Sequence, residues 1–220
     1  MTGAGLDKQL DELGFGIGSV YEAILTTLCP DGSPNASPMG VLRSGPFTLE
    51  IRPFKTSTTY WNLLGDRKAC INITDDPVLY LVTAFKDENL QGFGKQRVDD
   101  ELRLESSDAH VFVDVLDSRD ISGIRASFTC NVRSVEVRNP TPRVFSRGKA
   151  EAIEAIIHAT RIEVFAREGR WEQVERLISR FYACKDVVGR VSVPGSTEAR
   201  VIEELERLIG TWGEMASRSP

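Results

Sequence analysis

A hydroxyl-rich run at residues 55–59 is the part of this sequence best suited to binding a ligand. It reads Lys-Thr-Ser-Thr-Thr, follows a predicted strand that ends in Arg52, and precedes a short predicted helix. Backbone N–H groups at a helix start bind anions, and hydroxyls and nearby cations add donors and charge. The run therefore predicts a phosphate site formed by Arg52, Lys55, Thr56, Ser57 and Thr58. The alternative is an ordinary helix N-cap, which is also rich in Ser and Thr.

Other residues with reactive side chains form no recognisable catalytic group. His158 lies near Glu154 and Arg161 on what reads as the polar face of a helix, so we interpret it as solvent-facing. His110 falls in a polar stretch without an assigned element, where either a catalytic or an idle role is open. The Gly-Phe-Gly-Lys run at residues 92–95 lacks a preceding strand and is not a nucleotide-binding fingerprint. The catalytic residues are therefore unknown.

The cysteines and histidines indicate neither a metal site nor a disulfide framework. Zinc ligands cluster in sequence, whereas Cys29, Cys70, Cys130 and Cys184 are far apart and only two histidines are present. The first 18 residues mix charged residues with Gly and Leu, so they lack the apolar core of a signal peptide. No apolar run approaches the ~20 residues that cross a bilayer. We expect a cytoplasmic protein with free thiols and no metal.

The composition of the 220-residue chain is that of an ordinary globular protein. Hydrophobic residues make up 41% and charged residues 27%, which is enough apolar material for a core. The net charge of −5 argues against nonspecific binding to nucleic acid or to an anionic membrane, because either partner attracts a basic surface. A local basic pocket for a phosphate is compatible with that charge.

The first two thirds of the chain read as β-structure. Residues 55–64 predict a short helix, residues 78–85 fit either a strand or a helix, and the polar residues 86–110 predict a long excursion that acts as a lid or faces a partner. Short turns between strands are typical of small antiparallel barrels. Alternating apolar residues, separated by turn formers, predict strands at residues 17–29, 36–43, 47–52, 68–74, 111–116 and 126–137.

The last third of the chain reads as helical, and residues 140–142, Pro-Thr-Pro, mark its start. We predict an α+β fold, with an antiparallel β-barrel at residues 1–140 and a helical region at residues 141–220 that packs on the barrel. Three apolar stripes at helical spacing consist of Ile153, Ile156, Ile157, Thr160 and Val164, then Val174, Leu177, Ile178 and Phe181, then Ile202, Leu205, Leu208, Ile209 and Trp212.

Three segments carry a resemblance to a known superfamily. Residues 35–41 (Asn-Ala-Ser-Pro-Met-Gly-Val), 55–63 (Lys-Thr-Ser-Thr-Thr-Tyr-Trp-Asn-Leu) and 70–73 (Cys-Ile-Asn-Ile) resemble, in order and spacing, the FMN-binding split-barrel superfamily. That superfamily includes the flavin reductase-like and pyridoxamine-phosphate oxidase-like proteins. A barrel followed by a helical third is most similar to the uncharacterised flavoprotein family of methanogens and of bacteria that use tetrahydromethanopterin.

The resemblance implies FMN as cofactor and a split form of the barrel. The phosphate would lie at the hydroxyl run, the ring along the first segment, and two asparagines would contact the pyrimidine edge and brace the helix or touch the ribityl chain. It implies a homodimer with the flavin near the interface, and an oxidoreductase or flavin reductase acting on an unidentified small molecule; the alternative is a non-catalytic flavin carrier or sensor. The residues implied to bind the cofactor are Ser37, Pro38, Met39, Gly40, Arg52, Lys55, Thr56, Ser57, Thr58, Asn62 and Asn72.

Overall fold

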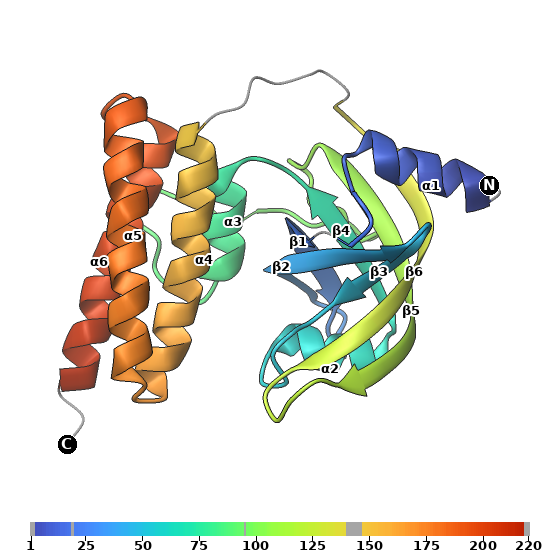
Figure 1. Cartoon of the computed structure of the whole chain (residues 1–220), viewed down its shortest axis with the longest axis horizontal. Coiled ribbons are helices and arrows are strands. Elements are labelled where there is room, and N and C mark those ends of the chain that lie inside the picture. Colours follow the sequence, from blue (N-terminus) through green and yellow to red (C-terminus); the bar gives the residue numbers. More distant parts are fainter. Residues whose placement is uncertain (1–2, 19, 95, 140–146, 218–220) are drawn as a thin grey trace. The chain divides into compact units, whose positions relative to one another are not determined.

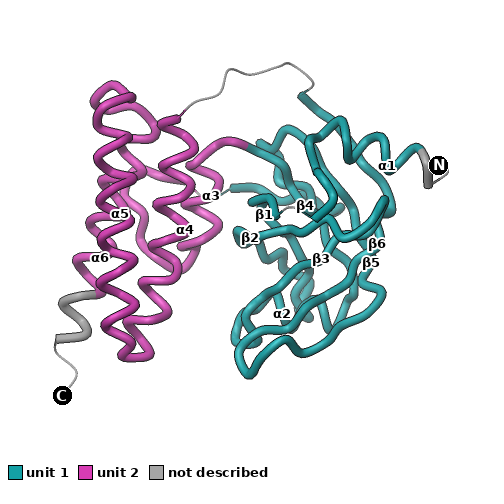
Figure 2. The backbone as a smooth tube through the Cα atoms, in the orientation of Figure 1, with its two compact units in different colours: residues 1–74, 96–141 teal, residues 75–95, 142–220 magenta. Residues whose placement is uncertain are grey.

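A computed structural model describes residues 3–18, 20–94, 96–139 and 147–217. The chain divides into two compact units, which Figure 2 shows in different colours. Residues 1–74 and 96–141 form the barrel unit, and residues 75–95 join residues 142–220 in the helical unit. The barrel expected over residues 1–140 is therefore interrupted, because residues 75–95 fold with the helices. Sequence periodicity did not reveal this crossing.

The barrel unit is a closed antiparallel barrel with the strand order β1-β2-β3-β6-β5-β4 (Figure 1). Neighbouring strands pair antiparallel around the whole ring, so the expected α+β fold with an antiparallel barrel and C-terminal helices is confirmed. The strands are β1 (Val20–Leu28), β2 (Pro34–Gly45), β3 (Thr48–Ile51), β4 (Lys68–Ile73), β5 (Ala109–Asp120) and β6 (Ala126–Val137).

The barrel interior is filled by alternate residues of each strand, as the two-residue period of a strand requires. Ala23 and Leu25 of β1 point inward, and they pair with Met39 and Ser37 of β2. The neighbouring Thr26 is buried as well, although it points to the opposite face. Strand β1 is therefore covered on both sides.

Two short helices lie near opposite ends of the barrel. Helix α1 (Gly3–Glu12) places Leu6 and Leu10 in the barrel core. Two carboxylates of this helix bind the buried Arg43 at one end of β2, Asp7 at 2.5 Å and Asp11 at 2.7 Å. Helix α2 (Thr58–Gly65) contacts β1 and β2 near the other end of β2 (Figure 1). The contacts of α2 with β1 and β2 set the position of the hydroxyl-rich run.

The helical unit consists of α3 (Pro77–Ala84), α4 (Arg147–Arg167), α5 (Trp171–Val191) and α6 (Thr197–Ser217). Residues 78–85, which fitted either a strand or a helix, belong mostly to α3. This helix begins at Pro77 because the Asp76 side chain caps its first turn. Helix α4 packs against α3, α5 and α6. None of the helices that the structure describes is long and apolar enough to span a membrane.

The buried face of α4 differs from the predicted stripe. Ala152, Ala155, Ile156, Ala159 and Ile162 are buried, whereas most of the predicted residues are only half-buried. Small alanines at helical spacing permit close approach of neighbouring helices, but they contribute little to a hydrophobic periodicity. The stripes on α5 and α6 are confirmed at the residues Val174, Leu177, Phe181, Ile202, Leu205, Leu208 and Trp212, which are all buried.

Candidate functional site

The start of helix α2 is capped by the third residue of the run at residues 55–59. Ser57 is the N-cap residue, with extended backbone angles of φ −82° and ψ 148°. Its hydroxyl accepts a hydrogen bond from the Tyr60 N–H at 3.2 Å and donates one to the Phe54 carbonyl at 2.7 Å. The N-cap interpretation is therefore confirmed for Ser57. Its hydroxyl is already engaged in hydrogen bonds within the turn.

The flanking hydroxyls are different. Thr56 and Thr58 are exposed, and neither hydroxyl has a hydrogen-bond partner within residues 3–18, 20–94, 96–139 and 147–217. Thr58 and Thr59 occupy the first turn of α2, where backbone N–H groups have no partner within a helix. The cap thus leaves two hydroxyls and the helix N-terminus open to a ligand that accepts hydrogen bonds.

Three cations from two segments lie near this turn. Lys55 pairs with Asp120 at 2.7 Å, and Arg52 donates through Nε to Glu50 at 2.8 Å. The Arg125 guanidinium lies 3.8 Å from the centre of the Phe54 ring and donates to the Arg52 carbonyl at 3.1 Å. The turn is held against the β5–β6 hairpin by the Lys55 N–H, which donates to the Ile124 carbonyl at 2.9 Å. This neighbourhood suits an anion.

The structure joins this turn to β2. The Thr59 hydroxyl lies 2.7 Å from the Ser37 hydroxyl, and the Asn35 amide donates to it at 3.2 Å. The Asn62 amide donates to the Thr27 hydroxyl at 3.0 Å and to the Cys29 sulfur at 3.4 Å. The first two predicted segments therefore meet in space, and Asn62 braces the helix, as one of its two expected roles requires.

The residues Ser37 to Gly40 alternate between the two faces of β2. Met39 packs against the barrel core, whereas Pro38 pairs with Ile24 and Gly40 pairs with Glu22 on the opposite face. A Cβ atom on Gly40 would lie 3.2 Å from a methyl carbon of Val20, so a larger residue there would require a small shift of the Val20 side chain. A ring along β2 would contact backbone and only one of the two sets of side chains.

A family model described as the N-terminal domain of a protein of unknown function, DUF447, matches residues 21–139. This match spans more than half of the chain. The chain belongs to the DUF447 family.

Similar solved structures include flavoproteins. An FMN-bound DUF447 protein from Methanosarcina mazei has a TM-score of 0.65 and 24% identity, covering 90% of this chain and 98% of that chain. The 2-nitrobenzoate 2-nitroreductase of Pseudomonas fluorescens has a TM-score of 0.44 and 17% identity, covering 63% of this chain and 76% of that chain. An FMN-binding protein from Thermus thermophilus with bound p-hydroxybenzaldehyde has a TM-score of 0.42 and 16% identity, covering 56% of this chain and 75% of that chain. The first of these has the fold of this chain.

In this DUF447 chain, Asn72 lies away from the hydroxyl run. Its amide group donates to the Ile24 carbonyl and the Thr26 hydroxyl, both at 3.0 Å, and its oxygen accepts from the Leu104 N–H at 2.8 Å. The side chain is fully buried. Thr26 and Thr27 point to opposite faces of β1, so Asn72 and Asn62 belong to different polar networks. Asn72 fastens residues 96–108 to the barrel.

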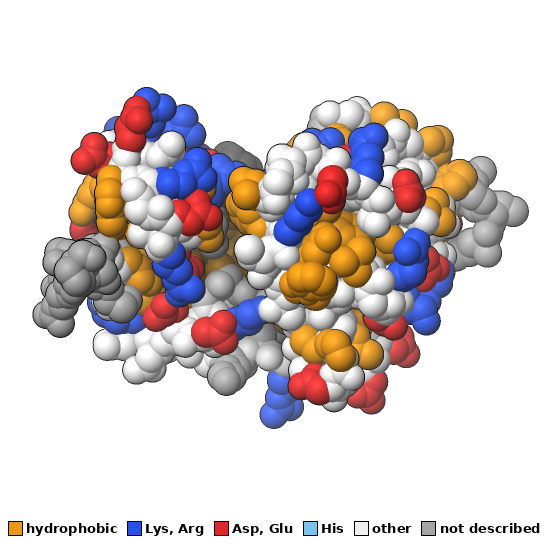
Figure 3. Space-filling view, turned by 90° about the horizontal axis from the view of Figure 1, so that it is seen from below, with side chains coloured by type: hydrophobic (Ala, Val, Ile, Leu, Met, Phe, Trp, Pro, Cys, Tyr) orange, Lys and Arg blue, Asp and Glu red, His pale blue; other side chains and the backbone are white. Residues whose placement is uncertain are grey.

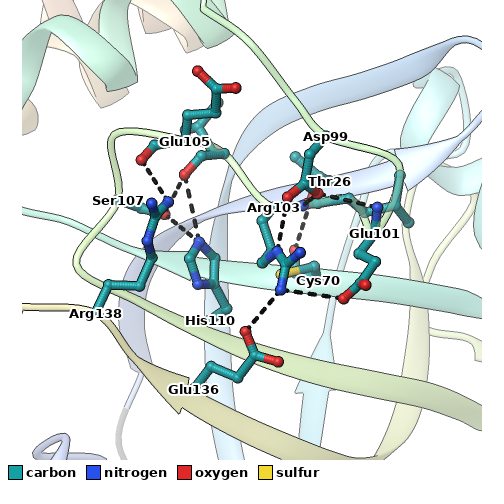
Figure 4. A network of polar contacts seen from close by, with 12 residues as sticks. Thr26, Cys70, Asp99, Glu101, Arg103, Glu105, Ser107, His110, Glu136 and Arg138 are labelled. Carbon is teal, nitrogen blue, oxygen red and sulfur yellow. Dashed lines mark hydrogen bonds and ion pairs between the residues drawn. The ribbon is translucent and has the colours of Figure 1, made fainter.

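The segment that covers Asn72 is the second half of the predicted excursion. Figure 4 shows Arg103 of this segment among three carboxylates, at 2.8 Å from Asp99, 3.1 Å from Glu136 and 3.2 Å from Glu101. Arg138 donates to the Glu105 carbonyl at 2.8 Å. A polar hollow of about 570 Å³ lies beside this network, lined by Asp99, Arg103, Glu105, Ser106, Glu136 and Arg138.

His110 is fully buried beneath the same segment. The Ser107 hydroxyl donates to the Leu104 carbonyl at 2.7 Å, so at the 2.9 Å contact between Ser107 and His110 the imidazole Nε2–H is the donor. Nδ1 then carries a bare lone pair, without a partner in the described part of the chain. Burial is the main cause that lowers the pKa of His110. This side chain is a neutral structural histidine.

The interpretation of His158 as solvent-facing is wrong. This residue was expected on a solvated face, but its side chain is 5% exposed, and its Nε2 lies 3.3 Å from Glu154. It shares the buried face of α4 with Ala155 and Ala159, and burial lowers its pKa as well.

Three cysteines are buried and stay protonated at neutral pH. Burial raises the pKa of the thiol to about 12 at Cys70, Cys130 and Cys184.

Proposed function

We propose that this protein binds FMN, with the phosphate at the start of helix α2. The observation that carries the proposal is the pair of exposed hydroxyls of Thr56 and Thr58, which flank the capping Ser57 and have no partner among the described residues. A phosphate accepts hydrogen bonds and gains from the positive end of a helix. Lys55 and Arg52 supply charge beside it.

The donor set fits the phosphate of a flavin mononucleotide. The turn offers hydroxyl and N–H donors for a dianion, and the link from Thr59 to Ser37 places the start of β2 beside the phosphate turn. The backbone of residues 37–40 would contact the ring, whereas Asn72 would not, because its amide is hydrogen-bonded within the barrel. The FMN-bound relative from Methanosarcina mazei supports the same cofactor.

We propose an oxidoreductase or flavin reductase that acts on a small molecule. FMN supplies the hydride or electron transfer when bound, and the protein supplies orientation and access. Thr56, Thr58 and Lys55 would bind the phosphate, Ser57 would hold the turn, and β2 would orient the ring. A flavin carrier or sensor without turnover is the alternative. The cytoplasmic location stays a prediction.

A homodimer is part of the proposal. Apolar side chains beside residues 55–59, the proposed phosphate turn, are exposed, with Trp61 at 62% and Ile124 at 54%. Figure 3 shows hydrophobic side chains gathered in patches on the barrel unit, on the right of the view. A second copy covering these residues would exclude water from a flavin bound nearby.

The test of cofactor binding is a titration of the purified protein with FMN. Wild-type protein should bind FMN, and the double variant Thr56→Ala/Thr58→Ala should bind it at least tenfold more weakly, because each hydrogen bond to a charged group contributes about 1.5–3 kcal/mol. Thr211→Ala, which removes a hydroxyl from α6, is the matched control and should leave the affinity unchanged. Failure of the wild-type protein to bind FMN would refute the proposal.

The second test concerns turnover. The FMN-loaded protein is mixed with NADH, NADPH or a reduced deazaflavin, and the flavin absorbance is followed. Reduction by one of these donors and reoxidation by an added acceptor support an oxidoreductase. Tight binding without reduction by any donor supports a carrier or sensor.

A further inference from the structure

Glu50 is a buried carboxylate on the outer face of the barrel, next to the phosphate turn. It lies between Leu49 and Ile51, which both point into the core, and it is only 7% exposed. Its Oε1 atom accepts hydrogen bonds from Arg52 Nε at 2.8 Å and from the Ser127 hydroxyl at 2.5 Å. The Arg52 hydrogen bond is the main cause that lowers the pKa of Glu50, so this carboxylate is ionised at neutral pH.

The contact with Glu50 uses only one edge of the Arg52 guanidinium. Nε donates to the carboxylate, while the terminal nitrogens Nη1 and Nη2 have no partner within the described residues. The Arg52 side chain is 48% exposed. A guanidinium donates through five N–H groups in a fixed plane, so anchoring Nε fixes the direction of the remaining donors.

The backbone around Arg52 is fixed as well. Its carbonyl accepts from Arg125, Pro53 is buried, and Phe54 forms an isolated bridge with Arg125. Lys55, the first residue of the hydroxyl run, follows directly. Arg52 therefore has an anchored main chain, an anchored Nε and two unengaged terminal nitrogens, three residues before Lys55.

We propose that Glu50 is a positioning residue, which holds Arg52 so that its terminal nitrogens bind the phosphate of FMN. This inference rests on the proposed function. Only the carboxylate of this ion pair is buried, because the Arg52 side chain is half exposed, so the pair by itself contributes little to stability. Its position beside residues 55–59 suits a role in orienting a phosphate ligand. The consequence is selectivity for FMN over riboflavin, which has the same ring and ribityl chain but lacks the phosphate.

The test compares the dissociation constants of FMN and riboflavin by quenching of flavin fluorescence. Arg52→Ala and Glu50→Ala should each weaken FMN binding about tenfold and leave riboflavin binding unchanged, since about 1.4 kcal/mol corresponds to a factor of ten. Adding Glu50→Ala to Arg52→Ala should weaken FMN binding no further, because Glu50 acts through Arg52. If Glu50→Ala fails to fold, Glu50→Gln, which keeps the size of the side chain, should also reduce the preference for FMN over riboflavin.

The matched control is Arg133→Ala, which removes an exposed arginine of β6 that lies 3.9 Å from Asp114. It should change neither affinity. If the wild-type protein prefers FMN and neither Arg52→Ala nor Glu50→Gln alters that preference, the inference is overturned and the proposed function stands. Equal losses for FMN and riboflavin would also overturn it. If the wild-type protein binds neither flavin, the proposed function itself fails, and the inference with it.

Discussion

The hydroxyl of Thr59 in α2 lies 2.7 Å from the hydroxyl of Ser37 in β2. This contact ties the first turn of the helix to the strand that precedes it by two elements, and Asn35 reinforces it with a 3.2 Å hydrogen bond. Thr59 is buried, whereas its neighbour Thr58 is exposed. Adjacent hydroxyls of one run therefore have different tasks: the inner one holds the turn, and the outer one is open to a ligand.

This division predicts opposite effects for two conservative substitutions. Thr59→Val keeps the shape but leaves the polar groups of Ser37 and Asn35 without this partner, which should lower the free energy of unfolding by about 1–3 kcal/mol. Thr58→Val should leave stability within about 0.5 kcal/mol and weaken FMN binding. Urea unfolding and an FMN titration of both variants check this. A loss of FMN affinity confined to Thr59→Val would contradict it.

Asn72 should act on stability and not on the flavin. Asn72→Ala removes the acceptor of the Leu104 N–H and the donor to Thr26, so we expect a loss of about 1–3 kcal/mol or more in the free energy of unfolding. Hydrogen exchange at residues 97–107 should become faster, since the segment loses its attachment. A variant that loses FMN affinity while keeping its stability and exchange rates would restore the expected contact with the pyrimidine edge.

Stability should fall as the pH is lowered past the ordinary titration range of histidine. Burial lowers the pKa of His110 in the folded state, whereas the imidazole of the unfolded chain has a pKa of about 6.5. Below that pH the unfolded chain binds protons that the folded chain does not, so the free energy of unfolding decreases from about pH 6.5 down to the lower pKa of the folded state.

The variant His110→Gln should therefore lose less stability than the wild-type protein between pH 7.5 and pH 5.5. Urea unfolding at both pH values measures the difference. His158 has a pKa lowered by burial in the helical unit, so His158→Gln should flatten the pH dependence separately, and the double variant further. An unchanged pH dependence in His110→Gln would show that this imidazole titrates alike in both states.

If the protein is a homodimer, analytical ultracentrifugation should give a mass of twice 24.4 kDa. Trp61→Ser should favour the monomer, because it removes a large apolar side chain that is 62% exposed in helix α2, close to residues 55–59. Trp171→Ser, which replaces a 45% exposed tryptophan of α5 in the helical unit, is the control and should leave the mass unchanged. A wild-type monomer at all concentrations would contradict the dimer.

The local features of the site could be predicted from the sequence, because they depend on neighbours in the chain. The position of the hydroxyl run before a short helix follows from Pro53, the cap-forming Ser57 and the apolar residues that follow. The alternation in β1 and β2 likewise reveals the strands. The same local pattern could not decide which hydroxyl caps the helix and which are exposed, since this depends on the Phe54 carbonyl that Ser57 reaches.

The remaining features depend on contacts between distant segments. Asn72 faces Leu104 because of the register of β4 against β1 and the course of residues 96–108, neither of which a strand pattern specifies. The burial of His158 depends on alanines whose packing a hydrophobic period underestimates. Helix α3 leaves the barrel because Asp76 and Pro77 start a helix, which packs on α4 and α6.

A crystal structure of the protein with FMN would locate the phosphate directly. We expect phosphate oxygens within about 3 Å of the hydroxyls of Thr56 and Thr58, at the N-terminus of α2. A phosphate bound elsewhere, for example in the polar hollow beside Arg103 and Arg138, with Thr56 and Thr58 still exposed to water, would contradict it.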